Sequence, residues 1–390
     1  MVQIIKNAYI HTCEDGDIES GYLCFKDGKI TAVGAMEVFD AAQYPGAQIT
    51  DADGAHIAPG FIDAHCHVGM WEDSMDFEGA DGNEDTDPIT PHLRAIDAIN
   101  PFDRCFSDAL HAGVTTVVTG PGSANVIGGQ FAALKTYGHS VDAMFLKAPL
   151  AMKFALGENP KSTYHAKNQA PVTRMGTAAL LRETLLRAQE YRRAKLDYAE
   201  NPQEADKPDY DMKLEALLPL LEKKIPAKVH AHRADDIMTA IRIAKEFDID
   251  ITLEHVTEGS LICDLLKEVR YPLMVGPALC ERCKIELHHS SFDTYKTLSD
   301  AGLDIAIITD HPVVPIEYLP LCASLAVKAG MNQDAALRAI TINAANNCGI
   351  GARVGSLRAG KDADIVLFDR HPVDFYARIG SVWVNGKKVV

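Results

Sequence analysis

The sequence lacks a long hydrophobic run. No uninterrupted apolar stretch approaches the roughly 20 residues that a membrane-spanning helix needs. The first residues, MVQIIKNAYIHTCEDGDIES, are too polar to contain the apolar core of a secretory signal peptide. We therefore expect a cytoplasmic protein with no membrane partner.

Basic residues are scarce. The chain has 38 Lys and Arg residues against 54 Asp and Glu residues, which gives a formal net charge of −16. A surface that binds nucleic acid needs positive charge to meet the phosphates, so this balance argues against a nucleic-acid partner.

The chain has nine cysteines in 390 residues. In a cytoplasmic protein we expect them to be reduced thiols. The one C-x-x-C motif, CERC, contains Cys280 and Cys283. It has no second pair to complete a zinc ribbon and no thioredoxin-like context, so we expect these two residues to be structural thiols.

Three sections of the chain differ in pattern. Residues 1–57 and 354–390 carry short β-like runs separated by turns. Residues 58–353 alternate short apolar runs with longer helical patterns, which is typical of βαβ units and a parallel sheet. The sequence therefore predicts a small β-sandwich formed jointly by 1–57 and 354–390, and a separate domain over 58–353.

The middle section contains enough candidate strands for a closed barrel. Eight parallel strands with helices between most of them predict an α/β fold, a TIM-type (β/α)8 barrel, whose active-site residues lie at the carboxyl ends of the strands. The connection between the third and fourth candidates is too short for a helix, which leaves open which of these two is a barrel strand. The candidate strands are 58–63, 115–118, 141–146, 150–155, 228–231, 250–255, 272–276 and 304–309. The helical patterns include 178–198, 212–224, 235–247 and 260–269.

Side chains that can bind metal gather at the ends of these strands. His65 and His67 follow the first candidate strand in APGFIDAHCHVG. Alternation along a strand turns both to one face and Cys66 to the other. The other such residues are Lys153 within the fourth candidate, His230 and His232 at the end of the fifth, His255 at the end of the sixth and Asp310 at the end of the eighth. A random scatter would not place such residues at so many strand ends.

The same segments carry a family resemblance that covers nearly the whole chain. APGFIDAHCHVG, GVTTVV, ITLEH, IITDHP and AITINAANNCGIGARVGSLRAGKDADIVLFD resemble segments of the amidohydrolase superfamily, in its imidazolonepropionase-related branch. The resemblance implies a metal-dependent hydrolase with two divalent ions, which we expect to be Zn²⁺. It implies that His65 and His67 bind one ion, that His230 and His255 bind the other, and that Lys153 bridges both as a carbamate formed with CO₂. Asp310 would be both a ligand and the catalytic base.

These implied roles agree with the chemistry of the residues. A free ammonium at Lys153 would be repelled by two divalent cations and would be costly to bury, whereas a carbamate is an anion with two oxygens. A water that bridges two ions becomes a hydroxide near neutral pH. Asp310 can take its proton as it attacks a carbonyl carbon, and can then return that proton to the leaving nitrogen.

Several assignments have alternatives. Glu158, in GENP, can supply the bridging carboxylate in place of Lys153. His230 and His232 compete for one ligand position in VHAHRADD, and we favour His230, with His232 as a support or a substrate contact. Weaker substrate-contact candidates are His311, Asn125 and Gln130; the last two lie in the glycine-rich GPGSANVIGGQ (120–130), which we expect to be a flexible loop.

The leading function is hydrolysis of a C–N bond in a small amide, cyclic amide or dipeptide-like substrate. The alternative is a single-metal deaminase or imidazolonepropionase-like hydrolase. Such relatives often place a glutamate three residues after the fifth-strand histidine, where this chain has Arg233. A non-catalytic assembly protein is a remote third reading, because such proteins lose ligands and this chain keeps all of them. We also expect a homo-oligomer.

Overall fold

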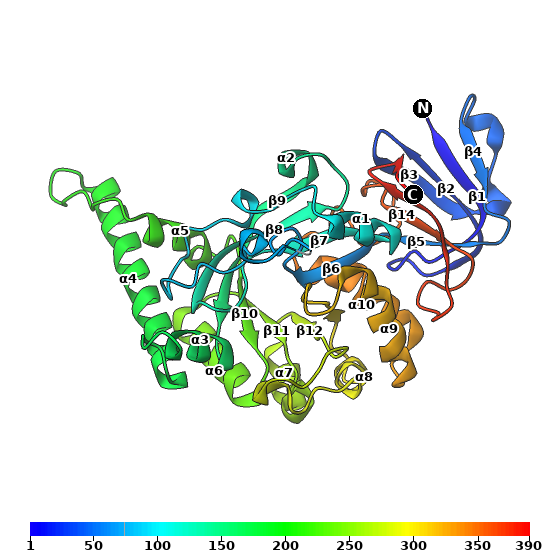
Figure 1. Cartoon of the computed structure of the whole chain (residues 1–390). Helices are drawn as coiled ribbons and strands as arrows, with labels where there is room; N and C mark the ends of the chain where they lie inside the picture. Colours follow the sequence, from blue (N-terminus) through cyan, green and yellow to red (C-terminus); the bar gives the residue numbers. More distant parts are fainter. Residues whose placement is uncertain (74) are drawn as a thin grey trace.

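Two β-sheets organise the chain (Figure 1). In this computed structural model, which describes residues 1–73 and 75–390, one sheet forms a barrel and the other is built from both terminal segments. The N-terminus and the C-terminus lie together on the terminal sheet, to one side of the barrel (Figure 1).

The barrel sheet has eight strands within the described residues, and their order around the sheet follows their order along the chain. The strands are β6 (Phe61–Cys66), β7 (Val114–Thr119), β8 (Ile127–Lys135), β9 (Phe145–Ala155), β10 (Ala227–Ala231), β11 (Ile251–His255), β12 (Leu273–Val275) and β13 (Ile305–Ile307). The first and last strands approach each other where Asp310 N–H donates to the carbonyl of His65 at 3.1 Å and His67 N–H donates to that of His311 at 2.9 Å. The mixed α/β fold is therefore a nearly closed barrel, as the TIM-type prediction requires.

The prediction that all barrel strands run parallel is wrong for β8. This strand pairs antiparallel with both β7 and β9, so it brings its amino end to the edge where the other strands end. It occupies much of the glycine-rich segment, and the loop expected over 120–130 extends only to Val126. The glycines allow a neighbouring segment to approach: Gly129 has φ +126°, and a Cβ there would lie 2.6 Å from the carbonyl oxygen of Leu93.

The predicted strand over 141–146 is also wrong. Its first residues form a short helix, α2 (Val141–Met144), because the Ser140 side chain caps it by accepting a hydrogen bond from Ala143 N–H. The rest joins the next candidate in one long strand, β9. β8 takes the place in the barrel that the 141–146 strand was expected to fill.

Helices surround the barrel sheet (Figure 1). The predicted patterns over 178–198, 212–224 and 235–247 are confirmed as α4 (Arg174–Glu200), α5 (Met212–Leu221) and α6 (Ala234–Phe247), and the pattern over 260–269 ends in α7 (Cys263–Val269). The other helices are α1 (Arg104–His111), α3 (Glu158–His165), α8 (Asp293–Asp300), α9 (Leu319–Lys328), α10 (Gln333–Ala339) and α11 (Ile342–Asn347). No helix in the described part of the chain is both long and apolar enough to span a membrane.

The terminal sheet combines strands from both ends of the chain. β5 pairs parallel with β1 and antiparallel with β14, so the N-terminal and C-terminal segments share one hydrogen-bonded sheet. The expected sandwich of two facing layers, with domain limits at 57/58 and 353/354, stays a prediction. The strands are β1 (Gln3–Ile10), β2 (Ile18–Lys26), β3 (Lys29–Ala35), β4 (Gln48–Asp51), β5 (His56–Pro59), β14 (Ile365–Phe368), β15 (Ile379–Val384) and β16 (Lys387–Lys388).

Two features join the terminal sheet to the barrel. Gly60 alone separates β5 from β6, so the strand predicted over 58–63 is divided between the two sheets. A Cβ on Gly60 would lie 2.0 Å from the Thr115 hydroxyl, so the chain needs glycine at this crossing. A buried ion pair lies at the same boundary, where Lys135 at the end of β8 contacts Asp364 and lies 3.0 Å from Asp362.

Candidate metal centre

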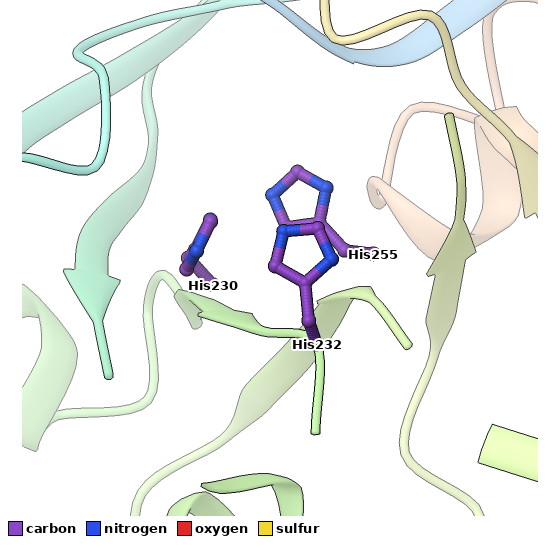
Figure 2. Close-up of side chains that lie close together, drawn as sticks. All are labelled: His230, His232 and His255. Atoms are coloured by element: carbon purple, nitrogen blue, oxygen red, sulfur yellow. The ribbon is translucent and has the colours of Figure 1, made fainter. Parts of the chain in front are cut away.

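Two groups of potential metal ligands lie at the carboxyl ends of the barrel strands. Within each group the ligand atoms are all within 4.8 Å of one another. One group contains His65, His67 and Asp310, and the other contains His230, His232 and His255 (Figure 2).

In the first group, acceptor atoms face one another. His65 Nδ1 donates to Glu254 Oε2 at 2.6 Å and His67 Nδ1 donates to the carbonyl of Gly120 at 2.6 Å. A neutral imidazole that donates through Nδ1 presents a lone pair at Nε2. These Nε2 atoms lie 3.6 Å and 3.1 Å from Asp310 Oδ1. Two nitrogen lone pairs and a carboxylate oxygen repel one another at such distances unless a cation lies among them, so this donor set fits a divalent metal ion.

The second group contains buried nitrogens without partners. His255 Nδ1 donates to the carbonyl of Gly276 at 2.9 Å, and His230 Nδ1 lies 3.0 Å from the Ser123 hydroxyl. Nε2 of both histidines is buried and has no hydrogen-bond partner among residues 1–73 and 75–390. An unsatisfied buried polar group costs about 1–3 kcal/mol, which a ligand at that atom would remove. Burial also lowers the pKa of both histidines, so both are in the neutral form that binds metal.

Ring geometry separates His232 from the other two histidines. The rings of His232 and His255 are nearly parallel, with an interplanar angle of 13° and centroids 4.4 Å apart, and Figure 2 shows them overlapping face to face. His230 is tilted by 69° to His255. A metal ion lies in the plane of each imidazole that binds it, so two stacked rings do not share an ion readily. This favours His230 with His255 as a ligand pair, and Nδ1 of His232 instead contacts the Thr257 hydroxyl at 2.7 Å.

Lys153 reaches the first group, whereas Glu158 does not. Lys153 is fully buried on β9, and its Nζ lies 3.1 Å from His65 Nε2. Burial lowers the pKa of its amine to about 8. Glu158 begins α3, where its N–H donates to Glu286 Oε2 at 3.0 Å and its own carboxylate accepts from Glu286 N–H at 3.3 Å.

A cavity of about 420 Å³ opens onto both groups. Its lining includes His67, His230, His232 and Asp310, together with Trp71 and a wall that carries Cys280, Cys283 and Lys284. The Trp71 ring contacts His67 edge to face at 4.9 Å. The C-x-x-C thiols therefore line the cavity, a place that the expectation of structural thiols did not include.

The weaker substrate-contact candidates do not line this cavity. The Asn125 amide makes its hydrogen bonds within the loops: it donates to the Glu84 carbonyl and the Thr90 hydroxyl and accepts from the Tyr164 hydroxyl. Gln130 lines a neighbouring cavity. His311 is buried, and its Nδ1 accepts from Ile316 N–H at 3.2 Å.

Sequence reasoning missed four residues near the centre: Trp71, Lys228, Glu254 and Glu286. Glu286 lies between α7 and α8, and its Oε1 is 3.5 Å from His230 Nε2 and 3.7 Å from His232 Nε2. Oε1 of Glu286 is buried and has no hydrogen-bond partner among the described residues. The sequence contained a signal for Lys228 and Glu254, because these charged residues lie within apolar strands two residues before His230 and one residue before His255.

Comparison with known proteins agrees with this arrangement. Residues 56–389 match the sequence model of the amidohydrolase family. Amidohydrolase tasK of Hapsidospora irregularis is 30% identical over 397 residues, which cover 95% of this chain and 39% of that protein. An adenine deaminase of Listeria monocytogenes is 28% identical over 415 residues, 99% of this chain and 57% of that protein. The chain thus spans well under two thirds of either relative.

A solved structure is similar over the whole chain. The crystal structure of an amidohydrolase from Thermotoga maritima superimposes with a TM-score of 0.94 and 39% sequence identity. The match covers 100% of this chain and 99% of that one, so the barrel and the terminal sheet are shared.

Proposed function

Since the chain belongs to the amidohydrolase family and is a hydrolase acting on C–N bonds, we propose that it cleaves a small amide or cyclic amide with two divalent ions and Asp310 as proton carrier. The observation that carries this proposal is the pair of converging ligand groups, His65 with His67 and Asp310, and His230 with His255. In the second group, the buried Nε2 atoms have no hydrogen-bond partner among the described residues.

The proposed ligands follow from those contacts. His65, His67 and Asp310 would hold one ion, His230 and His255 the other, and a carbamate on Lys153 would contact both. We propose Zn²⁺, which imidazole and carboxylate ligands suit. When bound, such ions lower the pKa of water and polarise a carbonyl oxygen.

Asp310 would then move the proton. Its carboxylate is mostly buried, and its Oδ1 lies 3.1 Å from Nε2 of His67 at the edge of the cavity. The anion accepts the proton of the attacking water and delivers it to the leaving nitrogen. The cavity holds a substrate of dipeptide size or smaller against Trp71. The cytoplasmic location and a homo-oligomeric state stay predictions from the sequence.

A second candidate is the deaminase or imidazolonepropionase type of reaction with one ion. Arg233 pairs with Asp235 at 2.9 Å and cannot take the place of the glutamate found in such relatives. Glu286, from another segment, brings a carboxylate to the centre instead. The similarity to an adenine deaminase points the same way. Cyclic amidines therefore belong among the substrates to be tested.

Metal analysis and a substrate screen test these proposals together. We expect about two equivalents of metal per chain; one equivalent would favour the second candidate, and none would contradict both. The metal-loaded protein is then assayed against N-acyl amino acids, dipeptides, cyclic amides, ureides and aminopurines. Release of ammonia from an aminopurine, with no amide hydrolysis, would favour deamination.

Asp310→Asn tests the proposed base. Removing a general base typically costs about 10²–10⁴-fold in kcat, and we expect that loss while most metal stays bound. Asp304→Asn, at an exposed position just before β13, is the matched control and is expected to keep full activity. Normal turnover by Asp310→Asn would exclude Asp310 as the base.

A further inference from the structure

A buried ion pair lies directly behind the first ligand group. We infer that Glu254, held by Lys228, is a positioning residue that fixes His65 in the tautomer and orientation needed to bind metal. This inference rests on the proposed function, because it takes His65 as a ligand. It goes beyond that function in assigning roles to two side chains that neither touch the cavity nor belong to the proposed ligand set.

Glu254 is fully buried and its two carboxylate oxygens are both engaged. Oε2 accepts from His65 Nδ1 at 2.6 Å and lies 3.0 Å from Lys228 Nζ. Oε1 accepts from the Thr252 hydroxyl. Lys228 is buried as well, and its Nζ also donates to the Ala64 carbonyl at 3.1 Å. Three strands, β6, β10 and β11, thus meet through one carboxylate.

This contact decides which nitrogen of His65 is free. A neutral imidazole carries one N–H and one lone pair, and a carboxylate can only accept, so Nδ1 must hold the proton. The lone pair is then at Nε2, the atom that lies 3.1 Å from Lys153 Nζ and 3.6 Å from Asp310 Oδ1. An outer carboxylate of this kind orients a ligating histidine and raises its basicity.

Lys228 makes the buried carboxylate tolerable. A buried carboxylate is costly unless it is paired and hydrogen-bonded. The ammonium of Lys228 at 3.0 Å offsets that charge, so the pair adds no net charge beneath the metal centre. We therefore assign Lys228 a structural role in support of Glu254.

The backbone explains how one strand supplies both Glu254 and a proposed ligand. Consecutive residues of a regular strand point to opposite faces. His255 has φ +72° and Val256 has φ +50°, a left-handed conformation that is unfavourable for such residues. The strand thus ends in a turn that sends the His255 ring to the second ligand group while Glu254 serves the first. Strained backbone of this kind is common at functional sites.

The test compares metal affinity in two buried-ion-pair variants. Glu254→Gln keeps the side-chain shape but removes the charge. We expect Zn²⁺, added to metal-free protein in competition with a chromogenic chelator, to bind about 10–100-fold more weakly at one of two sites. Asp364→Asn breaks the Lys135 pair at the sheet boundary and is the matched control, expected to bind both ions as wild type does. Thermal unfolding of each metal-free variant is recorded alongside.

The outcomes are distinct. Weaker binding in Glu254→Gln but not in Asp364→Asn supports the inference. Equal affinity of Glu254→Gln and wild type, or equal weakening in both variants, overturns it and leaves the proposed function standing. A wild-type protein that binds no metal overturns both.

A measurement on the wild-type chain decides the matter if Glu254→Gln does not fold. Metal-free protein labelled with ¹⁵N-histidine is examined by NMR, with the His65 resonances identified by their loss in His65→Asn. We expect His65 to carry its proton on Nδ1. A proton on Nε2 would contradict the proposed role of Glu254.

Discussion

Lys153 and Lys228 are direct neighbours, paired in register on β9 and β10, yet among the described residues Lys228 alone of the two has a carboxylate ion-pair partner. Both side chains are fully buried. The amine of Lys153 instead lies beside His65 Nε2 at 3.1 Å, and burial lowers its pKa to about 8. The two neighbouring lysines thus differ: the amine of Lys228 pairs with Glu254, whereas that of Lys153 has a lowered pKa and loses its proton more readily.

This difference predicts which lysine reacts with CO₂. Carbamate formation needs a neutral amine, so Lys153 is the expected site and Lys228 is not. After equilibration with ¹³C-bicarbonate, the wild-type protein should show a carbamate resonance that Lys153→Met lacks, and bound metal in that variant should fall from about two equivalents to about one. Lys135→Met, which removes another buried lysine, should keep the resonance. A carbamate signal in Lys153→Met would assign the modification elsewhere.

The stacked rings predict unequal effects of substituting the two histidines of β10. His230→Ala removes a proposed ligand and should lower the metal content by about one equivalent. His232→Ala removes a ring that lies parallel to His255, so the metal content should stay near two while KM or kcat changes. Elemental analysis of both purified variants distinguishes them, and the opposite order would make His232 the ligand.

Two glycines leave room for the Trp71 ring beside His67. A Cβ on Gly82 would lie 1.9 Å from that ring, and one on Gly122 would lie 2.8 Å from it. Gly82→Ala should therefore displace Trp71 from the cavity wall, shift tryptophan fluorescence and raise KM more than it lowers metal binding. Gly176→Ala is the control, because its nearest contact would be an ordinary 3.4 Å. The chain has two tryptophans, and Trp71→Phe identifies which one shifts.

A histidine cluster in the terminal sheet predicts loss of stability in mild acid. His11 Nδ1 lies 2.7 Å from Asp17, His11 Nε2 lies 2.9 Å from His56, and the His371 ring packs edge-on against His11. Tyr9 stacks on the cluster, and Asp334 lies 3.7 Å from His371. Burial, with the neighbouring His56, lowers the pKa of His11 from 6.5 to about 4, and burial lowers that of His371 to about 4 as well.

The sign of the effect follows from these values. Between pH 6.5 and 4 the unfolded chain binds protons that the folded chain does not, so the free energy of unfolding falls as the pH falls. His11 alone corresponds to about 2 kcal/mol lost at pH 5. Urea unfolding at pH 7.5 and pH 5 should show this loss, and His11→Asn should reduce it. His139→Asn, at an exposed position, should show the wild-type pH dependence.

The sequence was sufficient for the part of the site that depends on strand ends. His65, His230 and His255 follow short apolar runs, and a parallel strand must bring its last residues to the common edge of the sheet. β8 was missed because its opening residues, IGGQ, have the composition of a loop. Their glycines instead admit the segment around Leu93, a contact between residues that are distant along the chain.

The role of Glu254 could not be predicted from the sequence pattern for a related reason, although its place beside His255 is visible there. Glu254 meets His65 across 189 positions of sequence, and no periodicity links the two. Regular alternation would even have separated Glu254 from His255, and the left-handed backbone at His255 changes that. Asn125 shows the converse: its position in a glycine-rich loop suggested a substrate contact, but its amide ties two loops together.

The crossing at Gly60 bears on how the two sheets can be separated by engineering. Because a single glycine joins β5 to β6, the strand that carries His65 begins where the terminal sheet ends. A fusion or a domain exchange made at this point would free one end of the strand that carries the first histidine pair. The terminal sheet and the barrel are therefore not interchangeable modules, and a chimera should keep β5, Gly60 and β6 from the same parent.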